Sequence, residues 1–156
     1  MVSLETGGLI LPKGTTHRFD WLLGAAIIAA PFYWWLFSIL VAPASKPVLS
    51  DLVSQRFIIV ALVYPVLEEI VFRGALQGWL LRKGWGRRKW SGLSGANVAT
   101  SLLFAAIHVV RRPGMLSAAV FVPSLVFGFF RERYNNLYVP IALHVFYNAG
   151  VVLLFR

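Results

Sequence analysis

Three ionisable residues lie inside one apolar stretch, YPVLEEIVFRGAL, which runs from residue 64 to residue 76. Glu69 and Arg73 form an i,i+4 pair, so on a helix they share one face, with the acid on the favoured N-terminal side. Glu68 is rotated by about 100° from Glu69, and we expect it to find its partner on another helix. A carboxyl group held in this way in an apolar site can serve as a general base near neutral pH.

Further polar residues occur in two other apolar stretches. His108 lies in LLFAAIHVV, and the i,i+4 pair His144 and Asn148 lies in ALHVFYNAG. If His108 meets Glu68 across a helix interface, the two could hold and polarise a water molecule. His144 and Asn148 face the same way and could donate hydrogen bonds to the oxyanion that forms when a carbonyl is attacked. A base, a water and two such donors together predict hydrolysis of an amide.

The composition places these groups in a membrane. The chain of 156 residues is 58% hydrophobic and 13% charged, with a mean hydropathy of +0.72, whereas a soluble domain averages about 25% charged residues. A charge at the centre of a membrane-spanning helix costs about 2.5–3.5 kcal/mol, so the three ionisable groups must be paired, protonated or in contact with water. Such residues usually mark a functional site, and the alternative is a purely structural clasp between helices.

Two other features of the composition narrow the possible partners. The net charge of +9 would suggest nucleic acid in a soluble protein. In a membrane protein, basic residues beside the spans set topology and contact anionic lipids, so we expect the lipid bilayer and no nucleic acid as a partner. The chain has no cysteine, which excludes disulfides, thiol catalysis and cysteine-ligated metals.

The apolar stretches predict an all-α fold, a polytopic membrane bundle of about five transmembrane helices. An N-terminal tail and first helix (residues 1–55) precede a core at 56–156, and Pro65 should free the Ala61 carbonyl and favour a kink. The basic loop RKGWGRRKW predicts a cytoplasmic N-terminus, and we expect the inner (plasma) membrane of a prokaryote. The expected spans cover about residues 21–41, 57–81, 94–110, 115–130 and 137–155.

These residues resemble the CAAX protease and bacteriocin-processing (CPBP) family of glutamic-type intramembrane endopeptidases, over about residues 56–155. That family carries the motifs EExxxR, FxxxH and HxxxN or HxxxD on separate helices. The resemblance implies cleavage of a membrane-anchored protein or peptide precursor. It also implies that Glu68 and His108 activate water and that His144 and Asn148 form the oxyanion site, with Glu69 and Arg73 in support. The chain carries the motifs as Glu68-Glu69-Ile70-Val71-Phe72-Arg73, Phe104-Ala105-Ala106-Ile107-His108 and His144-Val145-Phe146-Tyr147-Asn148.

The resemblance leaves the cofactor open, because family members have been described both as metal-dependent and as metal-free. A divalent metal such as zinc could be held by Glu68, His108 and His144. We favour a metal-free site, because the HExxH arrangement is absent and Asn148 would have no role as a ligand.

Two other functions are compatible with the sequence. Gly92-Leu93-Ser94-Gly95 resembles the GxSG of rhomboid serine proteases, with Ser94 as nucleophile and His144 as base, although Ser94 is also a good helix cap. The chain could instead be a non-catalytic membrane binding or chaperone module. Gly74 and Gly78 form a GxxxG pattern that allows close helix packing, within the monomer or in a homo-oligomer. Neither the substrate nor the membrane face to which the site opens follows from the sequence.

Overall fold

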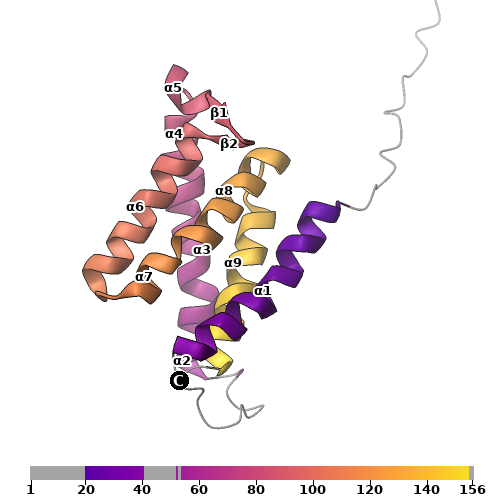
Figure 1. The fold of residues 1–156 in the computed structure, drawn as a ribbon, viewed down its shortest axis with the longest axis vertical. Helices are drawn as coiled ribbons and strands as arrows, with labels where there is room; N and C mark the ends of the chain where they lie inside the picture. The colour runs from indigo at the N-terminus through magenta and orange to yellow at the C-terminus, as the bar shows by residue number, and fades with distance from the viewer. Residues whose placement is uncertain (1–19, 41–51, 53, 155–156) are drawn as a thin grey trace, which may run out of the picture.

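The computed structural model describes residues 20–40, 52 and 54–154, which build a helical bundle with a small hairpin (Figure 1). The all-α prediction is confirmed. The second span is one long helix from Gln55 to Leu80, in which α-helical turns alternate with two π-helical segments. This helix comprises α2 (Gln55–Phe57), η2 (Ile58–Val63), α3 (Tyr64–Glu69), η3 (Ile70–Gln77) and α4 (Gly78–Leu80). The other elements are α1 (Trp21–Leu40), α5 (Gly84–Arg87), β1 (Lys89–Trp90), β2 (Leu93–Ser94), α6 (Gly95–Arg111), α7 (Met115–Ala119), α8 (Phe121–Tyr134) and α9 (Tyr138–Leu154).

The helices agree with the predicted spans. Trp21–Ile39 and Met115–Tyr134 are long and apolar enough to cross a membrane, and α6 and α9 are shorter apolar helices. The fourth span is divided between α7 and α8, where Pro123 lies in the first turn of α8. The hairpin was not predicted. It pairs Lys89 with Ser94 and Trp90 with Leu93 around two residues of positive φ, Ser91 and Gly92, as its tight turn requires.

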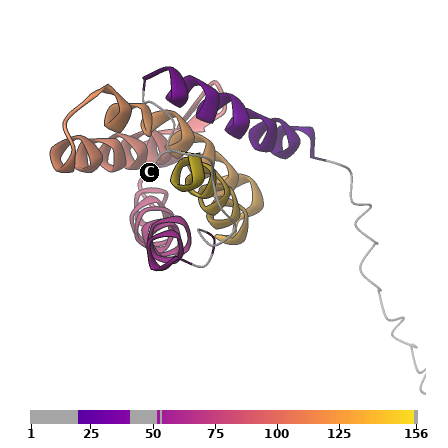
Figure 2. The same ribbon diagram turned by 90° about the horizontal axis from the view of Figure 1, so that it is seen from below.

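Helix α9 lies at the centre of the bundle, in contact with α1, α3, η2 and α8. Seen from below, α1 crosses the bundle on the side away from the long helix (Figure 2). Trp34 Nε1 donates to Tyr147 O at 2.9 Å, and the Tyr147 hydroxyl donates to Ala26 O at 2.8 Å. The two helices approach closely because position 150 is glycine, where a Cβ would lie 2.0 Å from the Trp34 ring.

The start of α1 is tied to the end of α8 by Asp20. Arg133 Nε and Nη2 donate to the two carboxylate oxygens of Asp20 at 2.7 and 3.3 Å, and the Tyr134 hydroxyl donates to Oδ2 at 2.6 Å. The hydrogen bonds from Arg133 and Tyr134 lower the pKa of Asp20 to about 2. We call these three residues the Asp20 clamp.

Helices α6 and α8 approach closely at Gly128, where a Cβ would lie 2.0 Å from Asn97 Oδ1. Asn97 Nδ2 donates to Leu125 O at 2.9 Å, and Ser101 Oγ donates to Asn97 Oδ1 at 3.2 Å. A side chain larger than glycine would separate the helices. This approach brings the middle of α8 toward the long helix and its ionisable residues.

The GxxxG pattern packs within the monomer at its first glycine. A Cβ at Gly74 would lie 3.3 Å from Leu137 Cδ1, whereas a Cβ at Gly78 would meet only Arg73 O, at 4.0 Å. Gly74 therefore contributes to the packing of a single copy of the chain.

Candidate active site

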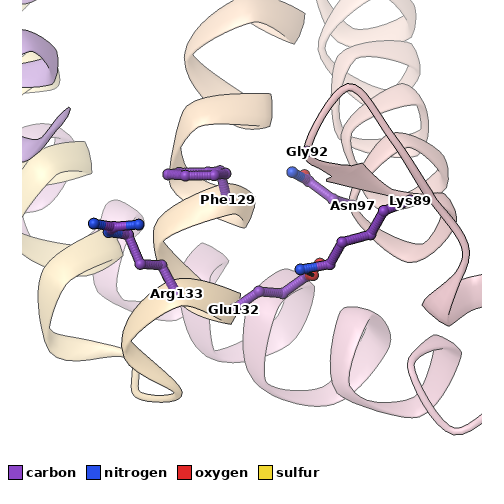
Figure 3. Close-up of a pocket in the computed structure, with 6 residues that line it drawn as sticks. All are labelled: Lys89, Gly92, Asn97, Phe129, Glu132 and Arg133. Carbon is purple, nitrogen blue, oxygen red and sulfur yellow. Dashed lines mark ion pairs between the residues drawn. The ribbon is translucent and has the colours of Figure 1, made fainter.

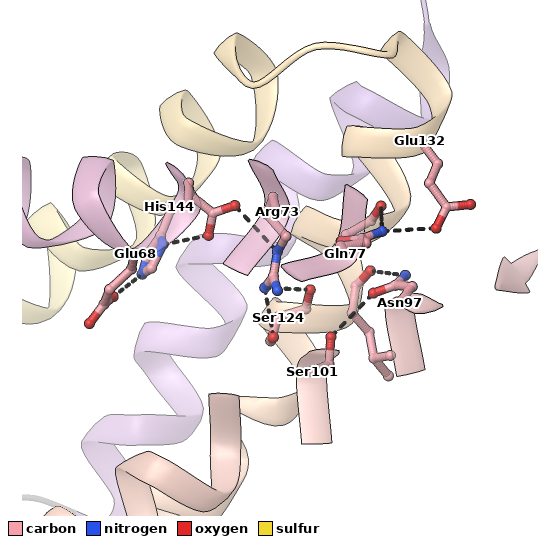
Figure 4. A network of polar contacts seen from close by, with 11 residues as sticks. Glu68, Arg73, Gln77, Asn97, Ser101, Ser124, Glu132 and His144 are labelled. Atoms are coloured by element: carbon pink, nitrogen blue, oxygen red, sulfur yellow. Dashed lines mark hydrogen bonds and ion pairs between the residues drawn. The ribbon is translucent and has the colours of Figure 1, made fainter. Parts of the chain in front are cut away.

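Glu69 and Arg73 form the expected ion pair, with both side chains fully buried and Arg73 Nε 3.3 Å from Glu69 Oε2. Arg73 Nη2 also donates to Ser124 O at 3.1 Å and to Ser124 Oγ at 2.7 Å (Figure 4). The guanidinium carbon lies 5.6 Å from the centre of the Phe104 ring. A buried charge is tolerated only when it is paired and hydrogen-bonded, and α8 supplies part of that requirement through Ser124.

His144 enters from α9 beside Glu68 (Figure 4), and each of its two ring nitrogens faces one of the two glutamates. Its Nδ1 lies 2.9 Å from Glu69 Oε1, and its Nε2 lies 3.6 Å from Glu68 Oε2. The imidazole stacks on Phe127, with 4.8 Å between ring centres. Glu68 thus has its partner on another helix, as its rotation from Glu69 predicted.

Asn148, one turn after His144, donates from Nδ2 to Val60 O at 3.3 Å. Val60 belongs to the turn of the long helix that precedes Pro65. This turn is π-helical, with the Tyr64 N–H bonded to Ile59 O. In that register, the N–H that Pro65 lacks would have bonded to Val60 O. The sequence prediction named the Ala61 carbonyl because it assumed α-helical spacing. The π register shifts the free carbonyl by one residue, to the one that Asn148 binds.

His108 is half-buried on α6 and bonds through Nδ1 to Phe104 O at 2.9 Å. A carbonyl only accepts, so Nδ1 carries the proton and Nε2 is left for other partners. Both His108 and His144 interact electrostatically with Glu68. The long helix and α6 are joined at one end of the bundle by residues 81–94, which include α5 and the hairpin. Glu68 lies 12 residues before Leu80, and His108 lies 13 residues after Gly95. The two residues therefore reach a similar depth.

The two adjacent glutamates differ in access. The Glu69 side chain is fully buried, whereas that of Glu68 is 26% exposed. The exposed fraction means that Glu68 can meet water or a substrate, while Glu69 is enclosed by Arg73 and His144. The structure brings all the candidate residues into one region between the long helix, α6 and α9, and their catalytic roles stay predictions.

The donor atoms suit a divalent metal in chemical type. Both histidines use Nδ1 for a protein partner, which leaves two Nε2 atoms and the Glu68 carboxylate, a set that metals such as zinc accept. Over the part of the chain that the structure describes, no three His, Cys, Asp or Glu side chains are gathered closely enough to hold a metal ion.

Ser94 caps α6, since its Oγ accepts from Asn97 N at 2.9 Å, and the capping interpretation is confirmed. The same hydroxyl donates to Glu132 Oε1, which also accepts from Gln77 Nε2 at 2.8 Å. A serine nucleophile needs an imidazole base within hydrogen-bond reach, and here the hydroxyl bonds to a carboxylate instead.

Gln77 and Glu132 are polar residues of the interior that the sequence motifs did not indicate. Gln77 is fully buried, and its Nε2 also donates to Gly128 O at 3.0 Å. A signal was present, because Glu69, Arg73 and Gln77 follow one another at i,i+4 spacing along one helix face. That spacing predicts a continuous row of buried polar groups.

A pocket lies beside the hairpin (Figure 3). Its residues Asn97 and Glu132 stand at the opposite end of the polar network from Glu68 (Figure 4). Its charged side chains already have partners, since Lys89 Nζ lies 3.9 Å from Glu132 and Arg133 belongs to the Asp20 clamp. Within each pair the positive and negative charges compensate each other, and we assign the pocket no function. Its lining residues are Lys89, Gly92, Asn97, Phe129, Glu132 and Arg133.

The fold and the site define a helical membrane protein with an acid–histidine–acid cluster between its helices. The chain belongs to the family described as type II CAAX prenyl endopeptidase Rce1-like, whose family model matches residues 51–150. The match includes every candidate site residue and leaves out α1. The resemblance to CAAX proteases is therefore confirmed.

One curated relative is "Putative membrane peptidase YdiL" from Bacillus subtilis (strain 168). The two sequences are 28% identical over 102 residues, which cover 65% of this chain and 38% of the relative. The chain thus matches well under half of the length of that protein. No solved structure was found to match the chain.

Proposed function

We propose that the chain is an intramembrane endopeptidase that hydrolyses a peptide bond of a membrane-anchored protein or peptide precursor. The observation that carries this proposal is the state of Glu68, a partly exposed carboxylate with His144 Nε2 at 3.6 Å and His108 in electrostatic range. The neighbouring Glu69 has its charge compensated by Arg73. Glu68 is therefore the acid of the pair that is free to exchange a proton with substrate and water.

In the proposed reaction, Glu68 and His108 hold a water molecule beside the scissile carbonyl. Glu68 takes a proton from the water, and the hydroxide oxygen forms a bond to the carbonyl carbon. The resulting oxyanion accepts hydrogen bonds from Asn148 Nδ2 and from His144 Nε2 when that nitrogen carries a proton. As the C–N bond breaks, Glu68 returns its proton to the leaving nitrogen. Glu69 and Arg73 support the helix that presents Glu68.

The cofactor requirement is part of the proposal. We favour chemistry without a metal. Were a divalent metal such as zinc bound, Glu68 and the Nε2 atoms of His108 and His144 would hold it, and it would polarise the carbonyl. Metal analysis of the purified protein, with activity measured before and after chelation, separates the two cases.

The test compares the termini of membrane peptides in cells that carry the wild-type chain, Glu68→Gln or Ser94→Ala. We expect new termini with wild type and with Ser94→Ala, and their loss with Glu68→Gln at unchanged protein level. Loss in Ser94→Ala alone would support the serine-protease alternative. Termini that persist in Glu68→Gln, or are absent from wild type, would oppose the proposal and favour a non-catalytic module.

A further inference from the structure

We infer that Ser124, on α8, is a positioning residue that orients the imidazole of His144 through Arg73 and Glu69. The inference deepens the proposed function and rests on it, since the orientation of His144 matters for hydrolysis only if His144 takes part. None of the three sequence motifs includes a residue of α8. The structure nevertheless connects that helix to the site by a chain of buried polar contacts (Figure 4).

The first contact of this chain joins Ser124 to Arg73. Ser124 is fully buried, and it accepts from Arg73 Nη2 with both its side-chain oxygen, at 2.7 Å, and its carbonyl oxygen, at 3.1 Å. Neither Arg73 Nε nor Arg73 Nη1 makes a hydrogen bond among the described residues, so the contact of Nε with Glu69 is an ion pair only. Ser124 therefore supplies the hydrogen bonds that fix the guanidinium plane, and the Phe104 ring 5.6 Å away limits where the guanidinium can move.

The remaining contacts lead from Arg73 to Glu68. Arg73 Nε lies 3.3 Å from one oxygen of Glu69, whose other oxygen lies 2.9 Å from His144 Nδ1. A carboxylate beside Nδ1 favours a proton on that nitrogen, which leaves Nε2 facing Glu68. This chain of contacts thus determines which nitrogen of the imidazole faces Glu68. It runs from Ser124 through Arg73 and Glu69 to His144.

Replacement of Ser124 by alanine removes the shorter of the two bonds to Arg73 and leaves the carbonyl in place. Arg73 Nη2 then keeps only one of its two hydrogen bonds. The guanidinium plane is held less firmly, so that Glu69 is oriented less strictly and its contact with His144 Nδ1 weakens. We expect kcat to fall roughly tenfold, as for the loss of one hydrogen bond to a buried charge. KM should change little, because Ser124 lies behind the site.

The experiment uses the full chain in lipid nanodiscs with isotope-labelled histidine, and it follows the ring nitrogens and Nδ1 proton of His144 by NMR. The variants are Ser124→Ala, Ser124→Thr, which keeps a hydroxyl, and Ser101→Ala. Ser101 is the matched control, a fully buried serine whose hydroxyl bonds to Asn97 outside this chain of contacts. We expect an upfield shift of the Nδ1 proton in Ser124→Ala, a wild-type position in Ser101→Ala, and recovery in Ser124→Thr.

The spectra do not depend on a substrate, so this inference and the proposed function can fail separately. Unchanged His144 signals in a folded Ser124→Ala variant, or equal shifts in Ser101→Ala, would overturn the positioning role even if cleavage is demonstrated. A selective shift in Ser124→Ala together with loss of activity supports it. A selective shift in a protein whose Glu68→Gln variant still produces the peptide termini would instead count against the proposed function.

Discussion

Adjacent glutamates in one helix can serve different purposes because one residue step turns the side chain by about 100°. Here that step separates a fully buried carboxylate, Glu69, from one that is 26% exposed, Glu68. Glu69 compensates a buried guanidinium and contacts His144 Nδ1, so its charge is required by the fold. Glu68 retains contact with the surroundings, so its charge is available for the proposed hydrolysis.

Glu69→Gln should therefore destabilise the protein more than Glu68→Gln does. Removal of the acid leaves Arg73 buried without a counter-charge, a change that typically costs about 3–5 kcal/mol. Thermal unfolding in one detergent should show a large fall in midpoint for Glu69→Gln and a small change for Glu68→Gln. The double variant Glu69→Leu with Arg73→Leu should recover part of the loss, because no charge is then stranded. Equal midpoints for the two single variants would contradict this division.

The sequence predicted these contacts as far as local spacing could. The i,i+4 spacing indicated the Glu69–Arg73 pair, and the rotation of Glu68 indicated a partner on another helix. Ser124 could not be found in this way, because its role depends on how closely α6 and α8 approach at Gly128. The carbonyl freed by Pro65 was assigned one residue too late in the chain, since the π register appears only when the helix is packed.

At the scale of whole helices, α1 lies outside the family match but is held by residues of α9 that lie inside it. The indole of Trp34 occupies space that any side chain at position 150 would need, and its Nε1 is fixed on Tyr147 O. Tyr147 lies next to Asn148 and one turn from His144. Helix α1 therefore stabilises the position of α9, which carries the candidate site residues His144 and Asn148.

Gly150→Ala should loosen α1 from α9. The added Cβ would lie 2.0 Å from the Trp34 ring, a contact that forces the helices apart, and such overpacking typically costs about 1–3 kcal/mol. Thermal unfolding should show a clear drop in midpoint. Gly84→Ala is the control, because a Cβ there meets no atom within 4 Å. A Gly150→Ala protein as stable as Gly84→Ala would argue against tight packing of α1.

Acid should release the Asp20 clamp. The pKa of Asp20 is lowered from 3.8 to about 2, so the folded state binds this proton less readily than the unfolded state. The clamp therefore adds stability above pH 4 that is lost as the pH falls from about 4 toward 2. The difference in unfolding midpoint between wild type and Asp20→Asn should shrink over that range. A difference that stays constant down to pH 2 would contradict the role of the carboxylate.

The helices were predictable from apolar length, because a bilayer requires long runs of apolar residues whatever their contacts. The division of the fourth span at Val120 was not predicted, although Pro123 is a local reason for it. The hairpin at residues 89–94 was also missed. Its strands have two residues each, too short for any alternating pattern to appear.

For the whole molecule, one end of the bundle carries more basic residues than the other. The hairpin, α5 and the turn between α8 and α9 lie together at one end, and α2 lies at the other (Figure 1). The first end includes the basic loop RKGWGRRKW, which predicts that it faces the cytoplasm. The turn after α6, with Arg111 and Arg112, would then face the opposite side. His108 lies near that end of α6, whereas Glu68 lies at the middle of the long helix.

Cysteine labelling can test this orientation. Because the chain has no cysteine of its own, each variant carries a single reactive position. Lys83→Cys lies between α4 and α5, and Arg112→Cys follows α6, so the two positions report on opposite ends of the bundle. In intact cells, a maleimide that cannot cross membranes should label Arg112→Cys readily. Lys83→Cys should be labelled only after the membrane is opened, and inverted vesicles should reverse the pattern. If Lys83→Cys is labelled in intact cells and Arg112→Cys is not, the N-terminus faces outward, and the end of α6 that carries His108 faces the cytoplasm.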